Sequence, residues 1–202
     1  RQYRNSQEIL DAAVAVAGED LIPSPHNDLE MIRRAASTHG APITGIKPRI
    51  VTCSSDEQQD QVLVDLVRQA VDDQIGLGDI AILCTSNKTQ KHFARVLREA
   101  GIDMQTLGDY DGRARKAIKI GTHLFSKGLE FKVVLLTDIS SETFPTPQHN
   151  RDSEEYEEYR NLAKTNLFVA MTRAQRRLNV LCVKEPSEFL WGALDYFDSG
   201  GR

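Results

Sequence analysis

The densest group of chemically useful side chains lies in the stretch Gly121–Phe131, which reads GTHLFSKGLEF. It separates two short runs of Val, Ile and Leu that we expect to be strands. Thr122 and His123 would then lie at the carboxyl end of a strand, where parallel sheets bind ligands. The same stretch offers a cation, a turn glycine and a carboxylate, namely Lys127, Gly128 and Glu130. A surface loop with one solvated lysine is the alternative, and spacing alone leaves both open.

A second candidate group closes a predicted helix, in the stretch Asn166–Ala174, NLFVAMTRA. Helical spacing predicts one stripe of core-facing side chains, formed by Tyr159, Leu162, Ala163, Asn166 and Ala170. Arg173 falls on or beside this stripe, so we expect its guanidinium to reach a buried carboxylate or an anion in a cleft. The alternative is an arginine whose stem covers apolar surface, and it suits Arg176 and Arg177 better.

A third group opens the chain, where Tyr3 and Arg4 come just before Ser6. Ser6 is a typical residue to cap a helix. An aromatic ring and a guanidinium at one helix start can stack on and pair with a single ligand. A disordered terminus is the alternative, and it is the better interpretation when this segment is considered alone.

The elements that must position these groups alternate along the chain. Apolar runs predict strands at Ile50–Cys53, Ile80–Cys84, Ile118–Thr122, Val133–Thr137 and Leu178–Val183. Helical periodicity predicts helices after Ser6, near Asp28–Ala36, from Asp56, from Asn87 to Gly101, and from about Ser153 to about Ala174. Strands that alternate with helices in this way predict a mainly parallel sheet with helices on both faces, a three-layer α/β fold.

Composition narrows the class of protein. The chain has 202 residues and a net charge of −4, which argues against coating nucleic acid or a membrane by bulk positive charge. No apolar run approaches the roughly 20 residues of a membrane span, so we expect no membrane contact. Cys53, Cys84 and Cys182 are widely spaced, which predicts buried, reduced thiols in a cytoplasmic protein. We therefore expect no zinc site or disulfide framework, and the histidines show no metal-ligand spacing.

Taken together, the three groups resemble a known family. The segments QYRNSQEI, THLFSKGLEF and NLFVAMTRA resemble, in order and spacing, motifs IV, V and VI of the UvrD/Rep type of superfamily 1 DNA helicases. The segment Asp79–Leu97 is similar to the strand and helix that follow motif IV. The resemblance runs from Tyr3 to Val183 and implies a RecA-like fold. It also implies the C-terminal motor domain of an ATP-dependent DNA helicase or translocase.

The resemblance implies a role for each matching residue. Arg4 and Arg173 match the arginines that reach the ATP γ-phosphate from across an interdomain cleft, where they act as arginine fingers. Tyr3 matches the aromatic residue that stacks on adenine, and Glu130 matches a carboxylate near the ribose. Thr122 and His123 match positions that face single-stranded DNA.

Two departures qualify that resemblance. The sequence contains no GxxxxGK[ST] loop, so ATP with Mg²⁺ is expected to be held mainly by an upstream motor domain. The isolated chain is therefore expected not to hydrolyse ATP. The interval between Glu99 and Ile118 is too short for the large accessory domain of some members. We expect one domain over residues 1–184 and a C-terminal tail, with a short helix, over 185–202.

Two rival functions stay open. Asp109 and Asp111 precede Glu130 and Lys132, a pattern that some metal-dependent nucleases use to bind Mg²⁺ and polarise a phosphate. The other rival is a non-enzymatic RecA-like domain that binds DNA, a nucleotide or a protein without turnover. Metal-dependent cleavage of labelled DNA would distinguish a nuclease. A GxxxxGK[ST] loop upstream of Arg1 in the full-length gene, followed by a DExx-type acidic pair, would distinguish a motor from a binding domain.

Overall fold

The structure is a computed structural model that describes residues 5–18, 46–110, 116–147 and 152–199. Tyr3, Arg4 and Asp111, as well as the helix predicted near Asp28–Ala36, lie outside the described residues. The statements below concern the described part of the chain.

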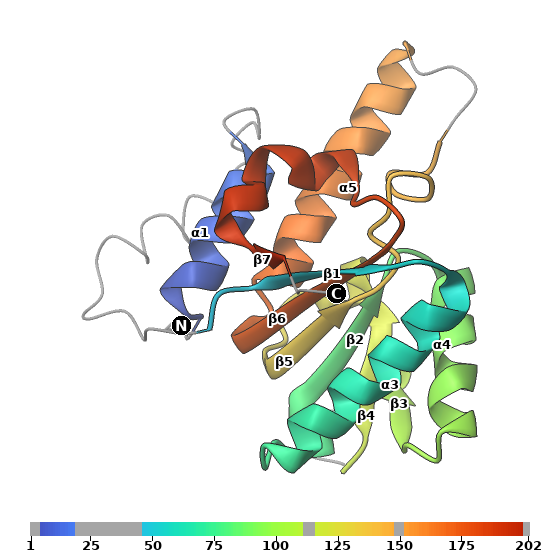
Figure 1. The fold of residues 1–202 in the computed structure, drawn as a ribbon. Helices are drawn as coiled ribbons and strands as arrows, with labels where there is room; N and C mark the ends of the chain where they lie inside the picture. Colours follow the sequence, from blue (N-terminus) through green and yellow to red (C-terminus); the bar gives the residue numbers. More distant parts are fainter. Residues whose placement is uncertain (1–4, 19–45, 111–115, 148–151, 200–202) are drawn as a thin grey trace.

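A parallel sheet of seven strands forms the centre of the fold, in the order β3-β4-β2-β5-β6-β1-β7 (Figure 1). The strands are β1 (Arg49–Cys53), β2 (Ile80–Cys84), β3 (Met104–Thr106), β4 (Ile118–Thr122), β5 (Phe131–Leu136), β6 (Ala174–Val183) and β7 (Asp198–Ser199). Every residue of β2 is buried, as its unbroken apolar sequence predicts for a strand covered on both faces.

Helices cover the two faces of the sheet (Figure 1). They are α1 (Gln7–Ala17), α3 (Asp56–Asp72), α4 (Asn87–Glu99) and α5 (Glu154–Met171), with 3-10 segments η1 (Leu77–Asp79), η2 (Leu107–Asp109), η3 (His123–Ser126) and η4 (Glu188–Tyr196). Each of the four α-helices begins after a serine whose side chain accepts a backbone N–H, and these serines are Ser6, Ser55, Ser86 and Ser153. The predicted three-layer α/β class is confirmed.

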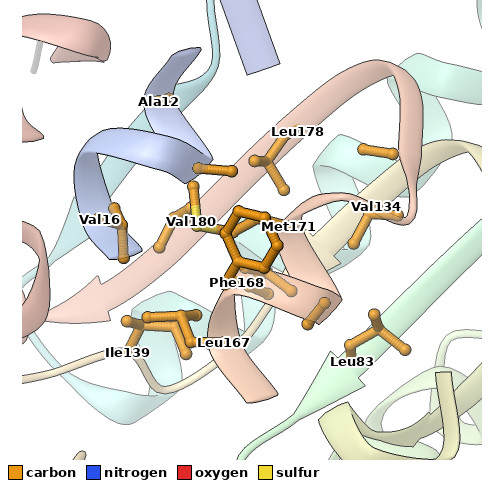
Figure 2. Packing of buried hydrophobic residues seen from close by; sticks show 14 of the residues in the cluster. Ala12, Val16, Leu83, Val134, Ile139, Leu167, Phe168, Met171, Leu178 and Val180 are labelled. Carbon is orange, nitrogen blue, oxygen red and sulfur yellow. The ribbon is translucent and has the colours of Figure 1, made fainter. Parts of the chain in front are cut away.

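Two apolar clusters hold the layers together. One lies between the sheet and α1, α5 and η4, and Phe168 and Met171 pack there against Leu178 and Val180 of β6 (Figure 2). The other lies under α3 and α4 on the opposite face, where Phe93 is buried. The three cysteines are buried, as expected, and each is a free thiol in this structure.

Helix α5 differs from its prediction in two ways. Its apolar stripe is displaced, because Leu162 is 59% exposed whereas Leu167 and Phe168 are buried. The helix also ends at Met171 instead of near Ala174, because Ala174 is already the first residue of β6. Only Thr172 and Arg173 separate these two elements.

The segment after β6 packs onto the domain. Phe189 and Leu190 of η4 are buried against α1, and Phe197 is buried as well. Strand β7 then pairs with β1, and the Asp198 N–H donates to the Pro48 carbonyl at 2.8 Å. The boundary expected after residue 184 stays a prediction.

Candidate functional site

Three distant stretches of the chain meet at the amino ends of β5 and β6. The Phe131 N–H donates to the Arg173 carbonyl at 2.9 Å, and Phe131 is in register with Ala174. The Ser6 N–H donates to the Gln175 carbonyl at 3.0 Å. The segments that contain Ser6, Phe131 and Arg173 therefore form one structural unit, although they are more than a hundred residues apart in places.

Asn5 makes the closest contact within this unit. Its side-chain Nδ2 donates to the carbonyl oxygens of Thr172 at 2.7 Å and of Ala174 at 2.5 Å. These two carbonyls flank Arg173 in sequence. The side-chain amide of Asn5 therefore donates both of its hydrogens to the backbone, one on each side of Arg173.

Arg173 is 5% exposed and directly precedes β6. Its Nε donates to the Val169 carbonyl at 2.9 Å, Nη1 to the Leu129 carbonyl at 3.3 Å, and Nη2 to the Thr172 hydroxyl at 3.0 Å. Each of these three acceptors is a neutral oxygen. These three bonds fix the orientation of the planar guanidinium, a group whose fork geometry suits phosphate oxygens.

Glu130 directly precedes β5 and lies on the surface beside this unit. Its Oε2 accepts a hydrogen bond from Gln175 Nε2 at 2.9 Å. Gln175 was not among the residues that the sequence singled out. Its contact with Glu130 follows from the register of β5 with β6, and nothing in the local sequence around Gln175 signals it.

The carboxyl end of β4 presents different residues from those expected. His123 is 4% exposed, and its ring lies edge-on to Phe144 with the centroids 5.7 Å apart. Burial lowers the pKa of His123 to about 4, so the ring is neutral at pH 7. The adjacent side chains of Leu124 and Phe125 are 62% and 55% exposed instead. The predicted contact of Thr122 and His123 with DNA stays a prediction.

Two glycines shape β4 and the loop that follows it. Gly128 has φ 82°, a backbone conformation that favours glycine, so the predicted tight turn is confirmed. Gly121 serves a different purpose, because a Cβ there would lie 2.6 Å from Leu107 Cδ1. Leu107 of η2 can therefore pack directly on the backbone of β4.

Two described members of the nuclease pattern, Asp109 and Lys132, make contacts outside that pattern. Lys132 Nζ pairs with Asp79 Oδ2 at 2.7 Å, and the Thr106 hydroxyl donates to Asp109 Oδ2. The described part of the chain contains no group of three or more His, Cys, Asp or Glu side chains that could hold a metal ion. Asp79 and Thr106, which the pattern did not include, thus bind two of its members.

A cleft of about 290 Å³ lies where β1 and β6 end, beside the start of α3. Its lining includes four carboxylates, those of Asp56, Glu57, Asp138 and Glu142. Lys184 also lines it and pairs with Glu142 at 3.5 Å. Burial raises the pKa of Asp138. The negative lining makes this cleft a poor place for a phosphate group.

Fold and site together define a RecA-like α/β domain. The chain belongs to the UvrD-like helicase C-terminal domain family, whose model matches residues 1–120 and 111–185. The resemblance to UvrD/Rep-type helicases is thereby confirmed at the level of the family.

A solved structure with a TM-score above 0.5 supports the fold. The C-terminal domain of a possible DNA helicase from Lactobacillus plantarum WCFS1 is similar over 100% of both chains, with a TM-score of 0.69 and 16% identity. The C-terminal domain of the DEAD-box protein Dbp5 gives a TM-score of 0.45 at 15% identity, over 75% of this chain and 81% of that one. No curated protein sequence matches the chain.

Among the helices that the structure describes, none combines the length and the apolar character needed to cross a bilayer.

Proposed function

We propose that this chain is the C-terminal motor domain of an ATP-dependent DNA helicase or translocase. ATP would bind between it and an upstream motor domain, and the chain would contribute Arg4 and Arg173 as arginine fingers. The observation that carries the proposal is the meeting of the Asn5, Glu130 and Arg173 segments, which are the three that resemble the family motifs. Membership of the UvrD-like family supports it independently.

The residues at this site fit one side of a nucleotide. Bound ATP with Mg²⁺ supplies a terminal phosphoryl group that is transferred to water. Arg173 would exchange neutral acceptors such as the Leu129 carbonyl for phosphoryl oxygens, an exchange favoured because charged acceptors make stronger hydrogen bonds. Its guanidinium would then stabilise the charge that develops on the departing group, an effect of about 10³–10⁵ in rate.

The other nucleotide contacts follow the same division between domains. Glu130, exposed and held by Gln175, would accept hydrogen bonds from the ribose hydroxyls. Tyr3 would stack on the adenine. Because the sequence has no phosphate-binding GxxxxGK[ST] loop, the cradle for the phosphates and the ligands for Mg²⁺ would come from the upstream domain.

DNA contact is proposed at the carboxyl end of β4 and in the loop that follows it. The exposed Leu124 and Phe125 offer apolar surface to bases, and the exposed Lys127 offers a charge to phosphates. Thr122 would add a hydroxyl contact to the backbone. His123 would support this loop from inside and reach DNA only if the loop opened.

Turnover by the full-length protein tests the proposal. Replacing Arg173→Lys keeps a buried cation but removes the planar fork, so DNA-stimulated ATP hydrolysis should fall at least about a hundredfold. Single-stranded DNA affinity, measured by fluorescence anisotropy, should stay within about twofold. A wild-type protein that binds DNA or nucleotide without hydrolysing ATP would establish the non-enzymatic alternative instead.

A further inference from the structure

Asn5 uses its side chain in a way that its place at a helix start does not require. Helix α1 is already capped by Ser6, whose Oγ accepts the Ile9 N–H at 3.4 Å. The amide of Asn5 instead crosses to the carbonyls of Thr172 and Ala174, at 2.7 and 2.5 Å. Ser6 continues the contact through its N–H, which binds the Gln175 carbonyl at 3.0 Å.

The backbone around Arg173 is fixed from several sides as a result. The Arg173 N–H donates to the Ala170 carbonyl at 3.2 Å, and the Arg173 carbonyl accepts the Phe131 N–H at 2.9 Å. Asn5 binds the carbonyls before and after. The polar backbone groups of the short α5–β6 connection are thus engaged, and the Arg173 side chain is held separately by its own hydrogen bonds.

The amide of Asn5 therefore fixes the connection that carries Arg173 from outside that connection. We propose that Asn5 is a positioning residue, which holds the backbone of Arg173 through the two flanking carbonyls so that its guanidinium can meet an anion. This inference rests on the proposed function.

The link extends to the carboxylate of the site through Gln175. The carbonyl of Gln175 accepts the Ser6 N–H, and its side chain binds Glu130 at 2.9 Å. Asn5 and Ser6 thus hold Thr172–Gln175, and Gln175 holds Glu130. Loss of the Asn5 contacts should displace Arg173 before any other residue of the site, because Asn5 binds the two carbonyls that flank Arg173.

The test is a double-mutant cycle in the full-length protein between Asn5→Ala and Arg173→Lys. Asn5→Ala alone should lower the kcat for DNA-stimulated ATP hydrolysis by about ten- to a hundredfold, because a misplacement of about 1 Å has effects of this size. The KM for ATP should change less than about twofold, since ground-state binding is expected to rest mainly on the upstream domain. In the Arg173→Lys background, Asn5→Ala should cause little further loss, because its effect runs through the same group.

Two further variants separate positioning from folding. Asn5→Ser keeps one hydroxyl donor that is too short to bridge both carbonyls, and it should give an intermediate kcat with a Tm close to wild type. Gln7→Ala is the matched control, because Gln7 Nε2 binds Asp11 at 2.6 Å on the same helix without touching the site. It should leave kcat unchanged.

Each failure has a distinct pattern. If Arg173→Lys hydrolyses ATP at the wild-type rate, the proposed function is wrong. If Arg173→Lys loses activity but Asn5→Ala does not, or if the two losses multiply in full, the positioning role alone is overturned.

Discussion

Phe131 and Arg173 are joined by a 2.9 Å hydrogen bond from the N–H of the first to the carbonyl of the second. The bond connects the first residue of β5 to the residue that precedes β6. It brings the loop that carries Glu130 next to the connection that carries Arg173. Glu130 and Arg173 therefore lie at the amino ends of their strands, whereas Thr122 lies at the carboxyl end of β4.

The buried guanidinium of Arg173 should stabilise the isolated chain as well as serve the proposed reaction. Arg173→Ala removes hydrogen bonds to Val169, Leu129 and Thr172 and exposes their oxygens to a cavity. We expect the free energy of unfolding in urea to fall by about 1–3 kcal/mol. Arg176→Ala is the control, because Arg176 is exposed and its removal should change stability by less than about 0.5 kcal/mol. Equal stabilities of the two variants would show that the hydrogen bonds of Arg173 do not stabilise the chain.

The buried ring of His123 should make stability depend on pH. Burial lowers its pKa from 6.5 to about 4 in the folded chain. The unfolded chain therefore binds more protons between these values, and stability is lost as the pH falls from about 6.5 towards 4. The loss attributable to this group is on the order of 3 kcal/mol. Urea unfolding at pH 7 and pH 4.5 measures it, and His123→Leu should flatten the slope. An unchanged slope in His123→Leu would place the cause elsewhere.

The exposed ring of Phe125 should contribute to binding of single-stranded DNA. Stacking of a base on an aromatic side chain contributes about 1–3 kcal/mol, so Phe125→Ala should weaken binding of oligo(dT) by fivefold or more, roughly. The chain itself should keep its stability, because the ring is 55% exposed. Tyr196→Ala removes another exposed aromatic ring, on η4, and should leave the affinity unchanged. Fluorescence anisotropy with the full-length protein gives both values, and equal losses would remove the specific role of Phe125.

The close packing of η2 on β4 should make Gly121 intolerant of substitution. The Cβ of Gly121→Ala would lie 2.6 Å from Leu107 Cδ1 and 2.8 Å from Leu107 Cβ. We expect a loss of about 1–3 kcal/mol in the free energy of unfolding, because the new Cβ displaces the side chain of Leu107. Gly108→Ala is the control, because no atom lies within 4 Å of a Cβ there. If Gly121→Ala is as stable as Gly108→Ala, Leu107 can move away from the new Cβ at no cost in free energy.

Long buried strands and capped helices could be predicted from the sequence because their signals are local. The apolar runs at Ile80–Cys84 and Ile118–Thr122 have the predicted bounds, and Ser6 and Ser153 cap their helices. Strand β3 was missed because three residues at the sheet edge are too few to show a period.

The contacts within the candidate site could be predicted less well from the sequence, for physical reasons. The three segments could be named, but the contacts of Asn5 and Gln175 depend on the register between strands far apart in the chain. The ring of His123 is buried because the chain turns into η3 at this residue, and the turn exposes Leu124 and Phe125 instead. Neither register nor turn direction is encoded in the spacing of the residues themselves.

The two-residue connection between α5 and β6 has a mechanical consequence. Because only Thr172 and Arg173 connect α5 to β6, the backbone of Arg173 cannot move independently of that helix and that strand. A guanidinium so mounted can approach a phosphate only by side-chain rotation or by rigid-body motion of the whole domain. In the proposed motor, the moment at which the arginine reaches the phosphate would depend on how this domain and the upstream domain close, so the arginine would act as a sensor of that closure.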